Sequence, residues 1–190
     1  MNAPIQNDVT FQRRERTLQS FMIYPVVKYG NGVLAKKAEP VRTFDKELAK
    51  LLDDMFESMY AANGVGLAAP QIGISRRIAV IDTTAGKDPK AKIVIINPEI
   101  VATEGRQSEE EGCLSVPEFR EKVTRPLRVT VRALDRHGKE FTMQGEGLLA
   151  RAFCHETDHL NGRLFLSHLS SLKRELILRK IRKMTKAGEW

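Results

Sequence analysis

Apolar residues recur along this chain at two different intervals, which predict both helices and strands. Asp45 is suited to cap a helix, and the residues after it repeat an apolar side chain every three or four positions. A second helix is expected over 146–161, closed by Gly162, and a third over about 170–186. The apolar stripe that the first helix should bury consists of Leu48, Leu52, Met55 and Met59.

Short strands are predicted where β-branched residues cluster or alternate with polar ones, at 77–81, 92–96, 128–135 and 139–144. In the third segment one face is apolar, and the turn residues that follow it connect it to the fourth as a hairpin. Because helices and strands do not alternate regularly, their order favours an α+β fold over a doubly wound parallel sheet. The apolar face consists of Val129, Val131 and Ala133.

The composition fits one folded domain. The chain has 190 residues, 42% of them hydrophobic, which supplies a core and excludes general disorder. No apolar run approaches the roughly 20 residues of a membrane-spanning helix. Two cysteines are too few for a disulfide scaffold. We expect a single domain over 21–190, preceded by a flexible extension, 1–20, that resembles an organellar targeting peptide only faintly.

The positive charge is concentrated at the C-terminal end. The net charge is +7, and residues 168–190 hold seven basic and two acidic side chains, so the rest of the chain is nearly balanced. A basic helix suggests an anionic partner such as a nucleic acid, and the alternative is a solvated helix face over an apolar inner stripe. The residues expected in that stripe are Leu169, Leu172, Leu176, Ile177, Ile181 and Met184.

The H-E-x-x-H pattern at 155–159 points most directly to chemistry. On a helix, His155 and His159 lie on one face and can bind the same cation, with Glu156 beside the open position as a proton shuttle for a metal-activated water. The alternative is a helix with two surface histidines, but here they extend the face of Leu148 and Ala152. A third histidine at the spacing of one protease class is absent, because Phe165 occupies that position.

A third ligand has to come from elsewhere in the chain. Cys113 follows an acidic run in what we expect to be a short loop, and a Cys-His-His set with one open position suits Zn²⁺ or Fe²⁺. Two alternatives stay open, a small buried side chain and a disulfide to Cys154. A carboxylate farther downstream, such as Glu175, would lie among basic residues and has no support.

The glycine-rich segment 64–71 matches a dinucleotide-binding fingerprint only superficially. That fingerprint follows a strand and opens a helix, whereas a helix precedes this segment and Pro70 follows it. We therefore expect no nucleotide cofactor. Glycines in an extended segment let another backbone approach closely, and Gln71 would offer a hydrogen-bond donor at its end.

Taken together, these segments resemble the peptide deformylase family. The family motifs are a G-x-G-x-A-A-x-Q loop, an E-G-C-L-S loop and an H-E-x-x-H helix, and this chain has all three in the same order at 64–71, 111–115 and 155–159. The likeness extends from about Met22 to the C-terminus. It implies antiparallel β-sheets packed around a central helix that carries the H-E-x-x-H motif, with a C-terminal helix after it.

The resemblance also implies an activity, the removal of the N-formyl group from the formyl-methionine of new polypeptides with release of formate. The metal would be Fe²⁺, replaceable by Zn²⁺, Ni²⁺ or Co²⁺, and Glu156 would act as general base and then acid. Metal ligands would be Cys113, His155 and His159, and the oxyanion would be stabilised by Gln71 and the backbone N–H of Leu114. The substrate would contact Val65, Gly66, Gly112, Leu148 and Ala152.

Some features depart from the family or leave alternatives. Cys154 stands where the family often has Gln, and Arg151 stands where an apolar residue is frequent, which affects the pocket and not the reaction. A general metallopeptidase on the same helix and a nucleic-acid-binding module are the competing hypotheses. The resemblance further implies a cytoplasmic protein of bacterial type, whose basic C-terminal helix contacts the ribosome.

Overall fold

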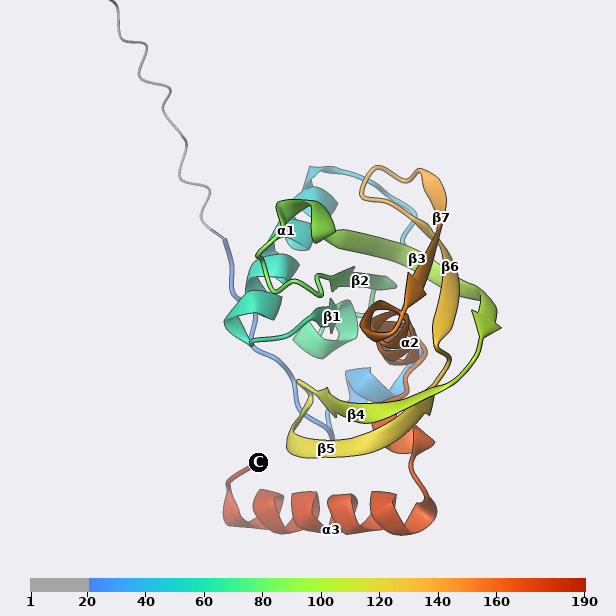
Figure 1. Ribbon diagram of the computed structural model, residues 1–190. Helices are drawn as coiled ribbons and strands as arrows, with labels where there is room; N and C mark the ends of the chain where they lie inside the picture. The colour runs from blue at the N-terminus through green and yellow to red at the C-terminus, as the bar shows by residue number, and fades with distance from the viewer. Residues whose placement is uncertain (1–20) are drawn as a thin grey trace, which may run out of the picture.

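The computed structural model describes residues 21–190, so the predicted extension, 1–20, lies outside the described residues (Figure 1). The chain forms an α+β fold, as predicted, with two antiparallel sheets. The larger sheet has the strand order β1-β2-β3-β6-β7, and the smaller one pairs β4 with β5. The strands are β1 Gly66–Ala68, β2 Ile78–Ile81, β3 Ile93–Glu104, β4 Gln107–Cys113, β5 Val116–Arg125, β6 Arg128–Leu134 and β7 Glu140–Glu146.

Three α-helices complete the described part of the chain: α1 Lys46–Ala61, α2 Leu148–Leu160 and α3 Ser171–Ala187. All three were predicted, α2 and α3 to within two residues at each end, and Asp45 caps α1 by accepting a hydrogen bond from the N–H of Leu48. Short 3₁₀ turns lie at η1 Gly32–Ala35, η2 Ala69–Ile72, η3 Pro89–Ala91 and η4 Phe165–His168. No helix within 21–190 is long and apolar enough to cross a membrane.

The helix α2 lies at the centre, with strands of both sheets around it (Figure 1). Its apolar side, including Phe153 and Leu160, packs with the buried faces of β2, β3 and β6. On the other side of the large sheet, the stripe of α1 is completely buried against β1 and β2, as predicted. The helix that carries the H-E-x-x-H pattern is therefore held from several directions.

One strand was predicted too short and one hairpin was not predicted, and both errors have local causes. The segment 92–96 continues as β3 to Glu104, because Asn97 adopts a left-handed conformation (φ 51°) and a bulge carries the pairing past Pro98. The hairpin of β4 and β5 was not predicted, since the acidic run 109–111 obscures the alternation of its strands. The predicted hairpin of 128–135 and 139–144 is confirmed as β6 and β7.

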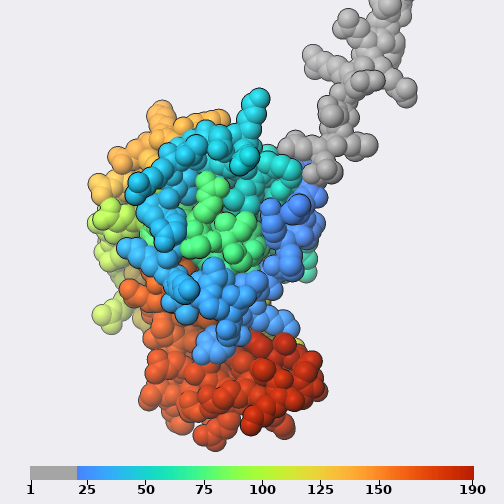
Figure 2. All heavy atoms as spheres, turned by 180° about the vertical axis from the view of Figure 1, so that it is seen from behind, coloured from blue at the N-terminus to red at the C-terminus, as the bar shows by residue number. Residues whose placement is uncertain are grey.

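The C-terminal helix α3 packs beneath the small sheet (Figure 1). Seen from behind, it forms the base of the molecule, next to the first described segment of the chain (Figure 2). Its contact is narrower than the predicted stripe: Ile177 and Ile181 are buried, but Leu172 is 70% exposed and Leu176 49% exposed. Leucines four residues apart share one face, and that face lies opposite Ile177 and Ile181 on the helix.

Candidate active site

The helix α2 presents His155 and His159 toward the small sheet, one turn apart. It ends at Leu160, directly after the second histidine, because Gly162 adopts a left-handed conformation (φ 71°). A Cβ on this glycine would lie 2.9 Å from backbone atoms of Ala35, so any other residue would displace the segment. Gly162 therefore fixes the end of α2 directly after His159.

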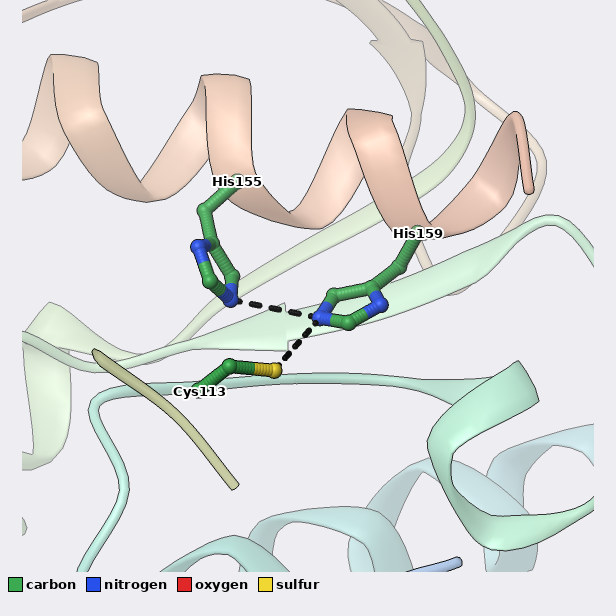
Figure 3. A group of neighbouring side chains, drawn as sticks. All are labelled: Cys113, His155 and His159. Carbon is green, nitrogen blue, oxygen red and sulfur yellow. Dashed lines mark hydrogen bonds between the residues drawn. The ribbon is translucent and has the colours of Figure 1, made fainter. Parts of the chain in front are cut away.

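Cys113 meets these histidines from β4 (Figure 3). Its Sγ lies 3.3 Å from Nε2 of His159, which lies 3.2 Å from Nε2 of His155. One ligand atom from each residue can be chosen so that all three lie within 4.8 Å of one another. Sulfur and imidazole nitrogen in this number, with room for a fourth group, suit a divalent cation such as Zn²⁺ or Fe²⁺. The residues therefore fit a catalytic metal ion.

Glu111 determines which nitrogen of His155 is available. Its Oε1 lies 2.7 Å from Nδ1 of His155, so Nδ1 carries the proton and donates it to the carboxylate, and Nε2 is left facing Cys113. Burial raises the pKa of the Glu111 carboxyl, but His155 and Arg125 outweigh it and hold the pKa well below the usual range. Glu111 is therefore an anion that is hydrogen-bonded to His155.

The electrostatics of the three ligands favour a thiolate at Cys113. Burial alone would raise its pKa, but the neighbouring His159 and His155 outweigh this and lower the pKa from 9.0 to about 5. Burial lowers the pKa of His155, while its hydrogen bonds with Cys113 and Glu111 raise it well above 6.5. A metal ion would take the place of the proton shared by these groups.

Glu156 lies beside the ligands, and its side chain is buried, with the residue 3% exposed. Burial raises the pKa of its carboxyl above the usual value of 4.5. Oε2 has no hydrogen-bond partner within residues 21–190. A buried carboxyl with a raised pKa and a free oxygen is suited to take up and release a proton.

The glycine-rich segment brings Gln71 to the same place. Gln71 is 1% exposed; its Oε1 accepts a hydrogen bond from the N–H of Ala68, and its Nε2 donates toward Ser115 Oγ (3.3 Å) and Cys113 Sγ (3.7 Å). Within residues 21–190 the close approach at Gly66 is made by a side chain, because a Cβ on Gly66 would collide with the carboxylate of Glu156.

A cavity of about 740 Å³ connects these elements, between β1, the β4–β5 turn and α2. The structure thus gathers the residues predicted from the sequence around one space, with His159 behind its wall. Leu148 is 51% exposed at the rim, so the face it shares with the histidines lines the cavity instead of the core. The predicted site residues that line the cavity are Val65, Gly66, Gln71, Gly112, Cys113, Leu114, Leu148, Ala152, His155 and Glu156.

The structure corrects the expected position of Cys113 and excludes one alternative for the two cysteines. Cys113 does not lie in a loop: it is the last residue of β4, and Leu114 and Ser115 form the turn to β5. The alternative of a disulfide is excluded, because both cysteines are free. Cys154 is 6% exposed, and burial raises the pKa of its thiol to about 11, so it acts as a packing residue.

The sequence interpretation missed the charged side chains behind the ligands. Arg125 donates to Glu111 through Nη2 (2.6 Å) and Nε (3.1 Å), and Arg151 donates to Glu111 through Nη1 (2.8 Å). The departure at Arg151 is thus a partner for Glu111 rather than an isolated charge in the pocket wall. Glu111 could have been found from its place at the start of the E-G-C-L-S motif, but the position of Arg125 gave no signal.

This site has two histidines on one helix, a thiolate beside them and a buried carboxyl that can accept a proton, all next to an open cavity. Together these features define a metal-dependent hydrolase. Comparison with known proteins specifies the class. Residues 23–175 match the model of the polypeptide deformylase family. The peptide deformylase of Acidobacterium capsulatum is 62% identical over 169 residues, 89% of this chain and 99% of that protein. That of Thermodesulfovibrio yellowstonii is 49% identical, covering 84% of this chain and 97% of its own length.

Solved structures agree with the sequence comparison. The crystal structure of a peptide deformylase from Legionella pneumophila is 51% identical and superimposes with a TM-score of 0.81, over 88% of this chain and 98% of that one. The chain belongs to the peptide deformylase family. It is a metal-dependent hydrolase, and its activity is the removal of the N-formyl group from nascent polypeptides.

Proposed function

We propose that Cys113, His155 and His159 hold the catalytic metal ion, and that this ion is Fe²⁺, with Zn²⁺, Ni²⁺ or Co²⁺ able to replace it. The observation that carries the proposal is the convergence of the three ligand atoms within 4.8 Å, next to the buried carboxyl of Glu156. A bound divalent ion supplies Lewis-acid chemistry, which acidifies water and polarises a carbonyl group.

Glu156 is the general base and then the general acid. It takes a proton from the attacking water, whose oxygen adds to the formyl carbon, and returns that proton to the amine nitrogen as the C–N bond breaks. Formate and the free amino terminus leave. The raised pKa of Glu156 supports both roles, because a carboxyl group that titrates closer to neutral pH can accept a proton and then give it up.

Gln71 and the backbone N–H of Leu114 stabilise the oxyanion that develops on the formyl oxygen. Nε2 of Gln71 points toward Cys113, and its Oε1 is fixed by Ala68, so the amide cannot flip without losing that bond. Leu114 is in the β4–β5 turn, and within residues 21–190 its N–H has no backbone acceptor. Preorganised donors of this kind are each worth about 10²–10³ in rate.

The peptide binds as an added strand along Val65, Gly66 and Gly112. β1 is an edge strand of the large sheet, and β4 has one unpaired edge in the small sheet, so both present free backbone groups to the cavity. Leu148 and Ala152 contact the methionine side chain. Leu148 is half exposed at the rim, which supports a role in covering an apolar ligand.

Replacing Glu156 tests the mechanism. Glu156→Ala and the isosteric Glu156→Gln should lower formate release from a formyl-Met peptide by about 10²–10⁴, the usual contribution of a general acid–base group, while metal content stays near one per chain. Full activity in either variant would contradict the proposed role.

Cleavage of an internal bond in an unformylated peptide by the wild-type protein would favour a general metallopeptidase instead.

We further propose that the basic helix α3 contacts the ribosome, where the substrate emerges. Arg179 and Lys183 lie on the same helix face as the exposed Leu172 and Leu176, and neither basic residue forms an ion pair within 21–190. An apolar pair flanked by free positive charge supports a contact with an anionic surface. We place the protein in the cytoplasm, with 21–190 acting as one domain; the extension, 1–20, remains a prediction.

A further inference from the structure

His168 lies at the exposed end of the turn η4 and joins a chain of charged side chains that leads inward. Its Nε2 is 2.7 Å from Oδ2 of Asp158. A carboxylate can only accept, so Nε2 carries a proton and donates it. Nη1 of Arg125 lies 3.1 Å from the same Nε2, and because both groups are donors they share Oδ2 of Asp158 instead of bonding to each other. The side chain of His168 is 32% exposed and that of Asp158 is 15% exposed. This pair forms the outer end of the chain.

Arg125 carries the chain from Asp158 to Glu111. Its Nη1 donates to the same Oδ2 of Asp158 at 2.7 Å, and its other two nitrogens donate to Glu111. The side chain of Arg125 is only 4% exposed and therefore lies in a region with little water. One carboxylate, Glu111 or Asp158, pairs with it at each end. Hydrogen bonds between charged groups in such surroundings are strong and sensitive to the loss of one partner.

The inner end of the chain is the metal-binding histidine itself. Oε1 of Glu111 accepts from both Arg125 (2.6 Å) and His155 (2.7 Å). The path therefore contains the residues His168, Asp158, Arg125, Glu111 and His155, each joined to the next by a hydrogen bond of 2.7 Å or less.

We infer that His168 is a positioning residue for the metal centre, which holds Asp158 and thereby orients Arg125, Glu111 and the imidazole of His155. The inference rests on the metal ligands proposed above. Phe165 and Leu166 anchor η4 in the core, so His168 is presented by a rigid turn. Without its donor, the partly exposed Asp158 turns to water, and one end of Arg125 loses its fixed partner.

The test compares His168→Leu, which removes the donor, with His168→Gln, whose amide can replace the Nε2 proton. The matched control is His137→Leu, an exposed histidine in the β6–β7 turn. Each protein is loaded with Zn²⁺, and the rate of metal loss to a chelator is measured. Co²⁺-loaded samples report the ligand geometry through their visible absorption spectra.

We expect His168→Leu to lose zinc about tenfold faster than the wild type and to shift the Co²⁺ absorption spectrum. Substituting a residue that supports a metal ligand usually changes metal affinity by about 10–100-fold, and a tenfold effect is at the lower end of that range. His168→Gln and His137→Leu should behave like the wild type. The effect should also disappear in an Asp158→Ala background, because it acts through that carboxylate. A purely structural role would lower the melting temperature of His168→Leu without changing its rate of metal loss or its spectrum, and that result would overturn the inference.

The two proposals fail in different ways. If the wild type binds no metal, or binds it equally well after Cys113→Ala, the proposed ligand set is wrong. If the wild type binds one metal that depends on Cys113, and His168→Leu retains it as the wild type does, only the role of His168 is wrong.

Discussion

Gly66 has no side chain, and the carboxylate of Glu156 occupies the space that a Cβ at this position would fill. A Cβ at position 66 would overlap the Glu156 carboxylate, with Cδ at 2.9 Å and Cγ at 3.2 Å. Glu156 is buried, so a Cβ at position 66 could be accommodated only by moving this carboxylate away from its present position. The glycine is therefore required by the position of the Glu156 carboxylate.

Gly66→Ala should lower kcat/KM for a formyl-Met peptide by at least about tenfold, because the displaced Glu156 loses part of a contribution of about 10²–10⁴. Metal content should not change. Gly32→Ala is the control, since its Cβ would meet nothing within 4 Å. The measurement is steady-state formate release, and wild-type kcat/KM in Gly66→Ala would show that the carboxylate tolerates displacement.

At the scale of an element, Asp82 fixes the end of β2 and the turn that follows. Its carboxylate accepts hydrogen bonds from the N–H of Thr84 and Gly86 and from the hydroxyls of Thr84 and Tyr60. Its own N–H donates to Val65, beside the cavity. Burial raises the pKa of Asp82, but these hydrogen bonds outweigh it and lower the pKa from 3.8 to about 2.

This lowered pKa predicts a stability that depends on pH. The folded state favours the ionised carboxylate, so its stabilisation is complete above the ordinary pKa near 4 and is lost as the pH falls through about 2. Asp82→Asn should lower the free energy of unfolding by about 2 kcal/mol at pH 7, and the difference from wild type should shrink between pH 4 and 2.

Urea unfolding at a series of pH values measures this difference. Asp88→Asn is the control, because the exposed Asp88 caps only the short turn η3 through the N–H of Lys90. A constant difference between Asp82→Asn and wild type across this pH range would contradict the prediction.

At the scale of the whole molecule, α3 lies apart from the cavity, and its outer face is the surface that we propose contacts the ribosome. Ile177 and Ile181 face the core, and Trp190 donates a hydrogen bond from Nε1 to the carbonyl of Tyr29. Deleting the helix would therefore expose the core under the small sheet, and substitutions on its outer face are a cleaner test of ribosome contact.

Arg179→Glu combined with Lys183→Glu should weaken co-sedimentation with ribosomes about tenfold at low salt, because both positive charges leave the outer face. Formate release from a free formyl-Met peptide should stay unchanged. Arg106→Glu with Lys139→Glu reverses two exposed charges elsewhere and serves as the control. Equal ribosome binding by the two double variants would leave α3 without the proposed role.

The sequence alone determined the features that depend on neighbours along the chain. The period of its apolar residues predicted α1, α2 and α3, and the alternation at 128–135 predicted a hairpin, because a helix or strand face is defined by local spacing. The three motifs and their order indicated the family for the same reason, since each motif is a short continuous segment.

Only the tertiary structure decided how these segments meet. It placed Cys113 against α2, set Glu156 in the space left by Gly66, and connected Arg125 to Glu111 and Asp158. It also turned Leu172 outward, where spacing alone had suggested burial. Residues distant in sequence come together through the packing of sheets on a helix, and hydrogen bonds between them depend on distances that no local pattern contains.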